Sequence, residues 1–272
     1  MPSPRAVAQA ARETRRGARM SIREIPAAAI TDAVEALCIE ANTRLPADVK
    51  AALDAAEAAE PWPLAKETLG LLQQNLCVAK EKDLPICQDT GMACVFIELG
   101  QDAHIDGDLT DAVNEGVRRG YEKAFLRKSI TADPLQRVNT GDNTPAFLTV
   151  HLVPGSGCKI TVAPKGAGSE NMSRLAMLKP ADGVEGVKKF VLDTVEQAGA
   201  NPCPPIVLGI GIGGTLRPLR SAGQKGAAAP AGRTQRRPVL CSAGKGTAGR
   251  HQCHRLWPAG LWRCHDLPGG CH

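Results

Sequence analysis

The sequence predicts an α/β fold of the mixed α+β type, with helices packed on a mixed sheet. Three observations support this prediction. Segments with apolar residues at helical spacing alternate with short apolar, β-rich runs along residues 20–215. The hydrophobic content of 43% is sufficient for a core in a chain of 272 residues. No run approaches the roughly 20 apolar residues that span a bilayer, and no secretory signal precedes the body, so we expect a cytoplasmic protein with no membrane segment.

Two amphipathic helices are predicted over residues 30–42 and 67–80. In each, apolar residues recur three or four positions apart and therefore share one helical face. Cys38 lies on the first of these faces, and both Cys38 and Cys77 are expected in the core.

A buried strand is predicted over Met92–Leu99, which reads MACVFIEL, and a helix over residues 109–130. The helix contains two glycines, but its apolar residues keep helical spacing and are expected to face the core. They are Val113, Val117, Tyr121, Ala124 and Phe125.

The remaining body predicts a hairpin, a helix and a strand. Residues 146–164 hold two β-rich runs around Pro-Gly-Ser-Gly, which is typical of a hairpin. An amphipathic helix is predicted over residues 184–199, with Gly199 at its carboxyl end. The run PPIVLGIGIGG over residues 204–214 is interpreted as a buried strand running into glycines.

Cys87 lies in a turn, Pro-Ile-Cys-Gln-Asp-Thr-Gly, directly before the Met92–Leu99 strand. The turn ends at Gly91, and side chains in such turns can project into a cleft. A buried, inert thiol is the alternative. Ten cysteines in a chain without an export signal favour reduced thiols, some of them metal ligands, over a disulfide framework.

Three further motifs concentrate polar residues and glycines: Asn139–Pro145, Ala163–Leu175 and Asn201–Thr215. The second could cradle an anion beside Lys165, but neither it nor GIGIGG has the spacing of a nucleotide-binding loop. In the third, prolines flank Cys203 and fix its backbone, as in many iron–sulfur ligand loops. A rigid turn with an incidental cysteine is the alternative.

Together the four motifs resemble the α subunit of the class I, iron–sulfur-dependent fumarate hydratases and tartrate dehydratases. The resemblance rests on PICQDTGMACVFIELGQD, NTGDNTPA, ITVAPKGAGSENMSRLAMLKPADGVEGVKKFV and NPCPPIVLGIGIGGT, and it covers the body from Met20 to Thr215. It does not separate fumarate from tartrate as the substrate.

The resemblance implies a [4Fe–4S] cluster held by three cysteines, with one iron left open to act as a Lewis acid on a C4 dicarboxylate. Two of the ligands fall on Cys87 and Cys203. The family's third cysteine, in a later Asn-x-x-Cys-His-Ala-like segment, has no counterpart here, so the ligand set is incomplete.

The resemblance also implies the substrate site. Gln88 and Asp89 are the candidate catalytic and substrate-binding residues, with Asp89 taking part in proton transfer. Arg127 matches an arginine that binds a substrate carboxylate, although a solvated arginine at a helix end is the alternative. Gly168 matches a backbone contact to substrate. A separate β subunit is implied, so we expect a hetero-oligomer.

The tail, residues 216–272, departs from the family. It holds ten of the 33 Lys and Arg but one of the 28 acids, and no periodicity. We interpret it as a frameshifted segment and expect it to be irregular and disordered. A zinc site is the alternative, although its spacings match no common finger. Its candidate ligands are Cys253, His254, Cys264, His265, Cys271 and His272.

Residues 1–19 carry five arginines and one acid, and are interpreted as a non-native start before Met20. An organelle-targeting peptide has the same composition and is the alternative. The chain's net charge of +5 comes from its tail, which lacks interleaved aromatic residues, so nucleic-acid binding is not expected.

Two functions of different classes follow. The chain is either the α subunit of a hydro-lyase or a non-catalytic, frameshifted remnant that lacks the third cluster cysteine and at most binds the β subunit. The reading frame of the coding DNA near codon 216 distinguishes them.

Overall fold

The computed structural model describes residues 22–213, 255–256 and 262–263. The predicted non-native start, residues 1–19, lies outside the described residues. So does most of the tail, including its expected irregularity; only two short strands are described there, β6 (Arg255–Leu256) and β7 (Trp262–Arg263), which pair antiparallel.

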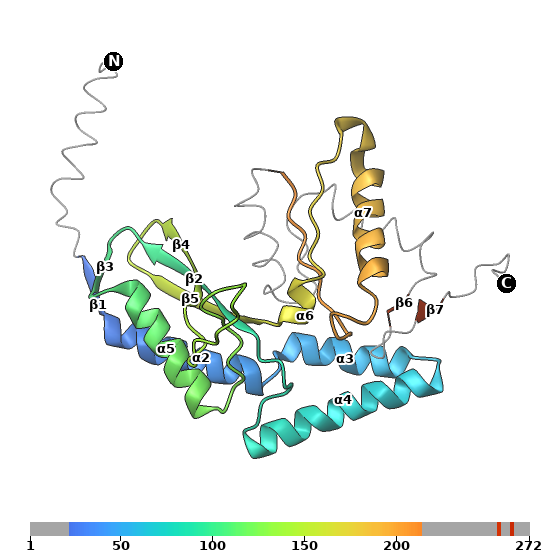
Figure 1. Cartoon of the computed structure of the whole chain (residues 1–272), viewed down its shortest axis with the longest axis horizontal. Coiled ribbons are helices and arrows are strands. Elements are labelled where there is room, and N and C mark those ends of the chain that lie inside the picture. The colour runs from blue at the N-terminus through green and yellow to red at the C-terminus, as the bar shows by residue number, and fades with distance from the viewer. Residues whose placement is uncertain (1–21, 214–254, 257–261, 264–272) are drawn as a thin grey trace, which may run out of the picture.

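A mixed three-stranded sheet forms the centre of the body, as predicted (Figure 1). Its middle strand is β2 (Met92–Gly100), which pairs in parallel with β4 (Phe147–Val153) and antiparallel with β5 (Cys158–Lys165). The β2 side chains alternate between the two faces and are buried from Ala93 to Ile97, so the predicted buried strand is confirmed.

The predicted hairpin over residues 146–164 is wrong. Both β-rich runs are strands, but they do not pair with each other, because β2 lies between β4 and β5. The chain crosses over the end of β2 at residues 154–157, where the Gly100 N–H donates to the Gly157 carbonyl. Each run therefore pairs with the more apolar β2 strand instead of with its neighbour in the sequence.

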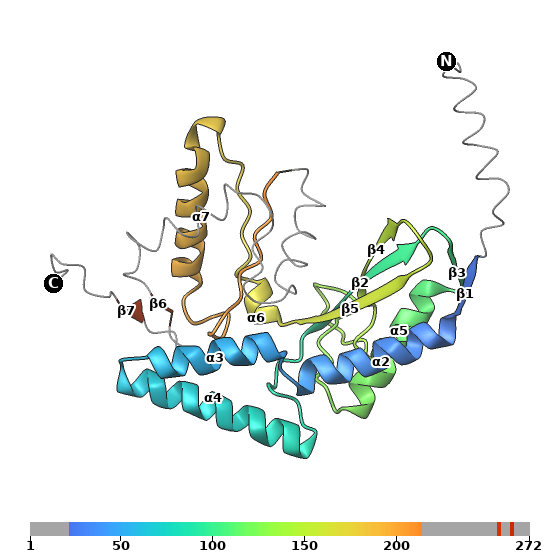
Figure 2. The same cartoon turned by 180° about the vertical axis from the view of Figure 1, so that it is seen from behind.

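Two helices cover one face of the sheet: α2 (Ala27–Thr43) and α5 (Leu109–Lys123) (Figure 2). Their apolar faces meet the odd-numbered residues of β2 in the main core, because residues two apart along a strand share a face. The buried set includes Ile30, Val34, Cys38, Ala93, Val95, Ile97, Val113, Val117 and Tyr121.

The helix predicted over residues 109–130 ends earlier, at Lys123. Phe125, expected in the core, is 87% exposed and has a φ of 56°, so it lies outside the helix. Leu126 is buried in its place. The left-handed backbone at Phe125 ends the helical pattern, so that Leu126 and not Phe125 is buried. The spacing of apolar residues alone does not reveal this change.

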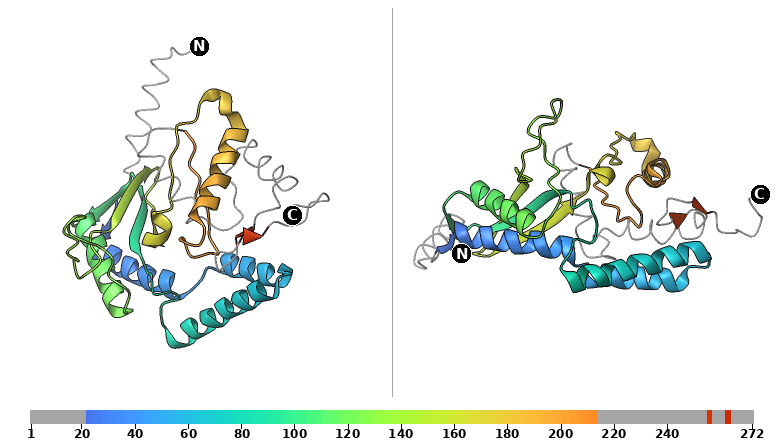
Figure 3. Two further views of the ribbon diagram at one scale, coloured as in Figure 1. Left: turned by 45° about the vertical axis from the view of Figure 1, so that its right-hand side comes forward. Right: turned by 60° about the horizontal axis from the view of Figure 1, so that its bottom comes forward.

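A second pair of helices, α3 (Ala47–Ala59) and α4 (Pro63–Lys82), lies beside this core; the two pack against each other and extend away from the sheet (Figure 3). The helical spacing of apolar residues predicts α4 but not α3, which is rich in alanine and has no buried residue. The expectation that Cys77 is in the core is wrong: its side chain is exposed, and within the described ranges α4 packs mainly against α3.

The other elements are short or stand apart from the main core. Strands β1 (Arg23–Pro26) and β3 (Ala103–Asp106) pair in parallel. After the single turn α6 (Ala167–Glu170) and the 3-10 turn η1 (Pro180–Asp182), the predicted helix is observed as α7 (Gly183–Ala198). Gly199 follows with a positive φ, as expected at a helix end.

The predicted buried strand over residues 204–214 is wrong for the part that the structure describes. Residues 206–212 have no regular secondary structure. Val207, Leu208, Ile210 and Ile212 are about half exposed. An apolar run becomes a strand only where a partner strand completes its hydrogen bonds, and none is described beside this one.

None of the helices in the described ranges is long and apolar enough to cross a membrane.

Two helical glycines give opposite stability predictions. A Cβ on Gly116 would lie 2.6 Å from the Thr31 carbonyl oxygen and 2.7 Å from Val34 Cβ, so Gly116→Ala should force α5 away from α2 and cost about 1–3 kcal/mol. A Cβ on Gly70 would meet only the tip of Glu57, at 3.3 Å, so Gly70→Ala should gain about 0.5–1 kcal/mol of helix propensity. Urea unfolding measures both; changes of the same sign would contradict the tight α2–α5 crossing.

Candidate functional site

The turn that carries Cys87 is held at its start by asparagines from two helices. The Ile86 N–H donates to the Asn42 carbonyl at 2.9 Å, and the Asn75 side chain donates to the Ile86 carbonyl at 2.8 Å. Cys87 itself is exposed, and its Sγ donates to Gln88 Oε1 at 3.5 Å. The backbone is therefore fixed while the Cys87 and Gln88 side chains face solvent.

The turn ends at Gly91, where the structure requires a glycine. Gly91 has a φ of 65°, and a Cβ there would lie 2.4 Å from the carbonyl carbon and oxygen of Lys165. This close approach follows from the antiparallel pairing of Met92 with Lys165 at the start of β2. It brings the Cys87 turn against the glycine-rich turn that follows β5.

Asp89 lies at the junction of these two turns. Its Oδ1 accepts a hydrogen bond from the Gly91 N–H at 3.2 Å, and its Oδ2 would lie 3.0 Å from a Cβ on Gly166. Lys165, the last residue of β5, donates to Ser169 Oγ at 2.7 Å and pairs with Glu170 at 3.3 Å. The Asp89 carboxylate is half-buried, and one of its oxygens lies against backbone that has no side chain.

Arg127 is joined to the same turn through Thr90. The Arg127 N–H donates to Thr90 Oγ1 at 2.9 Å, and that hydroxyl lies 3.3 Å from the Arg127 carbonyl, to which it donates. Thr90 is buried, whereas the Arg127 side chain is exposed. The predicted carboxylate-binding guanidinium thus extends into solvent from a fixed backbone.

Two more buried side chains converge on Gly91. The Tyr121 hydroxyl lies 3.0 Å from the Thr90 carbonyl and 3.2 Å from the Gly91 carbonyl. Asn143 Nδ2 donates to the Gly91 carbonyl at 3.2 Å, and Asn143 Oδ1 accepts from the Ser129 N–H at 2.6 Å. Burial raises the pKa of Tyr121 well above its ordinary value, so this hydroxyl remains a donor.

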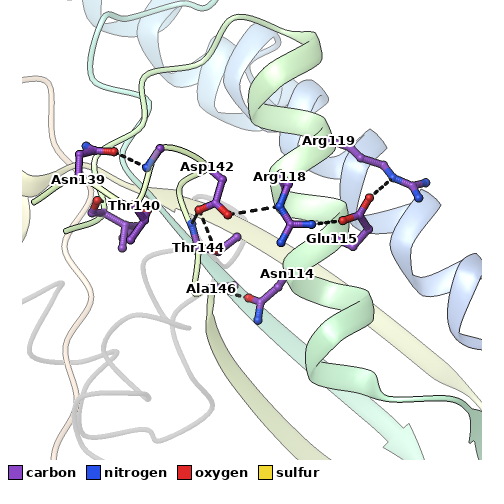
Figure 4. A network of polar contacts seen from close by, with 11 residues as sticks. Asn114, Glu115, Arg118, Arg119, Asn139, Thr140, Asp142, Thr144 and Ala146 are labelled. Atoms are coloured by element: carbon purple, nitrogen blue, oxygen red, sulfur yellow. Dashed lines mark hydrogen bonds and ion pairs between the residues drawn. The ribbon is translucent and has the colours of Figure 1, made fainter. Parts of the chain in front are cut away.

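The loop that supplies Asn143 is tied to α5 by a polar network (Figure 4). Asp142 Oδ2 accepts from Arg118 Nε at 3.3 Å, and Glu115 pairs with Arg118 and Arg119. Burial would raise the pKa of Asp142, but hydrogen bonds from the hydroxyl and N–H of Thr144 and from Arg118 outweigh it and lower that pKa. The network fixes the loop with Asp142 ionised.

Gly168 and Cys203 are brought near each other through Asn201. A Cβ on Gly168 would lie 3.0 Å from the Asn201 carbonyl oxygen, and the Asn201 side chain donates to Met172 Sδ at 3.7 Å. Cys203 follows with a φ of 55° and an exposed thiol. The turn of Gly168 therefore adjoins both the Asp89 turn and the loop that carries Cys203.

Four of the six described cysteines form two contrasting pairs. Burial raises the pKa of Cys38 to about 12, and burial followed by the charge of Glu170 raises that of Cys94 to about 11, so both remain neutral thiols. Cys87 and Cys203 are exposed. Within the ranges that the structure describes, no group of three or more His, Cys, Asp or Glu side chains is arranged to hold a metal ion.

The structure thus links the segments that carry four of the predicted site residues, and their roles stay predictions. Gln88, Asp89, Arg127 and Gly168 come from segments that are linked, directly or through one residue, by the contacts above. The sequence gives no role to the side chains that link these segments. Thr90 and Asn143 lie inside two of the motifs without a predicted role, and Tyr121 is predicted only as a core residue. The feature that marks these residues is the burial of a polar side chain, and burial of a polar residue cannot be read from composition or spacing.

A sequence model of the family described as fumarate hydratase (Fumerase) matches residues 31–243, which is more than half of the chain. The chain belongs to this family. The match continues beyond Thr215, the predicted boundary of the body, so that boundary stays a prediction.

Individual proteins similar to this member of the fumarate hydratase family have a more specific name. The chain is 43% identical over 194 residues to a Methanocaldococcus jannaschii protein provisionally named L(+)-tartrate dehydratase subunit alpha, an alignment that covers 68% of this chain and 67% of that protein. It is 30% identical over 207 residues to L(+)-tartrate dehydratase subunit alpha of Escherichia coli strain UTI89, covering 75% and 68%. The predicted resemblance to an α subunit of this family is confirmed.

The polar network predicts a pH-dependent stability. Because the pKa of Asp142 is lowered in the folded state, its carboxylate stabilises the fold above its unfolded pKa of about 3.9, and the effect is lost as pH falls through the lower folded value. Asp142→Asn should therefore cost about 1 kcal/mol at pH 7 and almost nothing near pH 2.

Urea unfolding at both pH values tests this prediction. Asp106→Asn, at the exposed end of β3, is the matched control and should change stability by less than about 0.5 kcal/mol. An equal cost for Asp142→Asn at both pH values would show that its charge plays no part.

Proposed function

We propose that the chain is the α subunit of a hydro-lyase that adds or removes water on a C4 dicarboxylate, either fumarate and malate or tartrate and oxaloacetate. The observation that supports this most directly is the link between Asp89 and Arg127 through Thr90. It joins a candidate proton-transfer group and a candidate carboxylate anchor from segments 38 positions apart in the chain.

Arg127 suits the carboxylate-binding role because a guanidinium offers two parallel N–H donors to one carboxylate. Its side chain is exposed, while both of its backbone polar groups are satisfied by the buried Thr90 hydroxyl. A bound dicarboxylate would therefore be oriented by an arginine whose main chain does not need to move. Gln88, exposed next to Asp89, could donate its amide to a second substrate oxygen.

Asp89 suits the proton-transfer role because one of its oxygens is already held. Oδ1 accepts from the Gly91 N–H, which fixes the plane of the carboxylate, and Oδ2 lies against the bare backbone of Gly166. Dehydration of a 2-hydroxy acid requires removal of a proton from carbon and protonation of the departing hydroxyl. A fixed carboxylate can take part in either transfer.

The [4Fe–4S] cluster is proposed from the family, and the described donor set does not complete it. Cys87 and Cys203 are exposed thiols of the right chemistry. Within the described ranges, no group of three or more His, Cys, Asp or Glu side chains is arranged to hold a metal ion. No step of the reaction is therefore derived through the cluster.

A β subunit is the proposed partner, because the relatives are named as α subunits. It would supply the substrate-binding and proton-transfer groups that the described site lacks. We propose a hetero-oligomer in the cytoplasm, with no nucleic-acid or membrane partner.

The second candidate function is a non-catalytic remnant that at most binds the β subunit. The observation that favours it is the half-exposed apolar run at residues 206–212, which forms no strand although its sequence suits one. If the coding DNA near codon 216, read in the restored frame, encodes a helix and a third cysteine, a frame error accounts for the tail. An unchanged frame would favour the remnant.

Kinetics of the frame-restored chain with its β subunit test the proposed roles. Arg127→Ala should raise KM at least tenfold, because a carboxylate anchor is lost, and Asp89→Asn should lower kcat roughly 100-fold, because the amide cannot accept a proton. Arg137→Ala, in the exposed loop, is the matched control and should leave both constants unchanged. Fumarate and tartrate should both be assayed; unaltered kcat in Asp89→Asn would remove Asp89 from the proton path.

Iron analysis of the chain as it stands tests the ligand set. Because Cys87 and Cys203 provide only two thiolates, anaerobic reconstitution should not yield a stable cluster. Iron and sulfide contents, with the absorption spectrum of the desalted protein, measure this. A content near about four irons per chain would contradict it and would mean that a tail cysteine completes the site.

A further inference from the structure

We propose that Thr90 and Asn143 are positioning residues that hold the Asp89 turn and the Arg127 segment in one fixed arrangement. The proposal rests on the proposed function for its purpose, namely the spacing of two substrate-binding groups. Its structural content, a lock between two segments of backbone, stands on contacts within this chain.

The first part of the lock is the Thr90 hydroxyl. It accepts from the Arg127 N–H at 2.9 Å and donates to the Arg127 carbonyl at 3.3 Å, so it satisfies both backbone groups of a single residue. Thr90 is only 3% exposed, which excludes water as a substitute partner. The hydroxyl thus does for Arg127 what a neighbouring strand does for a residue in a sheet.

The second part of the lock is the Asn143 side chain, which bridges the same two segments one residue beyond Thr90 and two residues beyond Arg127. Its amide nitrogen donates to the Gly91 carbonyl, and its amide oxygen accepts from the Ser129 N–H. Asn143 is fully buried and has a φ of 62°, a left-handed conformation that asparagine tolerates better than most residues. Its placement is secured by the Asp142–Arg118 network beside it.

Two bridges between two segments restrict motion more than one does, because a single hydrogen bond allows pivoting about its partners. In the Asp89 turn, the two bridges attach at the consecutive residues Thr90 and Gly91. In the other segment, they attach at Arg127 and Ser129. With both backbone segments fixed, only rotamer changes of Asp89 and Arg127 can alter the distance between their charged groups. This is the arrangement expected where a site must hold two charged groups at a set separation.

The test uses the full chain and two local readouts, neither of which requires turnover. Cys87, three residues before Thr90 and exposed, reports the turn through its rate of alkylation by iodoacetamide, measured by peptide mapping. Trypsin cleavage after Arg127 reports the other segment. Cys203, also exposed, is the internal control for alkylation, and Arg174 for cleavage.

Thr90→Val keeps the shape of the side chain and removes its hydroxyl. It should raise both the Cys87 alkylation rate and cleavage after Arg127 at least threefold through local opening, with Cys203 and Arg174 within about twofold of the parent. Thr90→Ser, which keeps the hydroxyl, should restore both rates. Thr31→Val removes an equally buried hydroxyl, 5% exposed and bonded to the Ala112 carbonyl, and should change neither.

The variant Tyr121→Phe should affect one of the two readouts and not the other. It removes the hydroxyl bonded to the Thr90 and Gly91 carbonyls but leaves the Thr90–Arg127 bridge, so Cys87 alkylation should rise while cleavage after Arg127 stays constant. If Thr90→Val does not fold, Thr90→Ala is measured in its place.

The proposal is overturned if Thr90→Val leaves both local rates unchanged, if Thr90→Ser fails to restore them, or if Cys203 and Arg174 change by the same factor as Cys87 and Arg127. The last result would mean general loosening in place of a local lock. Failure of the proposed function is distinguishable, because it would appear as absent hydro-lyase activity with these rates still as expected.

Discussion

The site depends on one close approach, that of the Gly91 backbone to Lys165. Only a residue without a Cβ can occupy this position, since any side chain would lie 2.4 Å from the Lys165 carbonyl group. The approach sets the first pair of the β2–β5 ladder and places the Cys87 turn against the turn after β5. The Gly91 carbonyl, directed away from that ladder, accepts from Tyr121 and Asn143. One residue thus joins the sheet to the site.

The central position of β2 explains why motifs far apart in the sequence meet at one end of the sheet. Since β4 runs parallel to β2, its amino end, with the loop of Asn143 before it, lies at the amino end of β2. Since β5 runs antiparallel, its carboxyl end, with Lys165 and Gly166, lies there too. The loop of Asn143 and the turn after β5 therefore gather where the Cys87 turn ends, and α5 and α2 cover the face beside them (Figure 1). A hairpin of β4 and β5 would have separated these loops from the turn.

The site combines buried backbone contacts with exposed functional side chains. Thr90, Tyr121 and Asn143 satisfy main-chain groups away from water, where such hydrogen bonds are strongest. The side chains that the family implicates, at Cys87, Gln88 and Arg127, are exposed. Under the proposed function, these exposed groups would meet a surface supplied by the β subunit.

The sequence by itself determined the helices α2, α4 and α7, the buried strand β2, the fold class and the family, because apolar periodicity and long motifs are local properties of the chain. Only the tertiary structure decided the rest. The order β4-β2-β5 depends on which strands compete best for pairing, and the exposure of Cys77, Phe125 and residues 206–212 depends on what packs beside them. Likewise, the sequence presented Thr90 and Asn143 as two polar residues in turns. These residues bridge the Asp89 turn and the Arg127 segment because segments far apart in the sequence bury them together. No local sequence pattern encodes this contact.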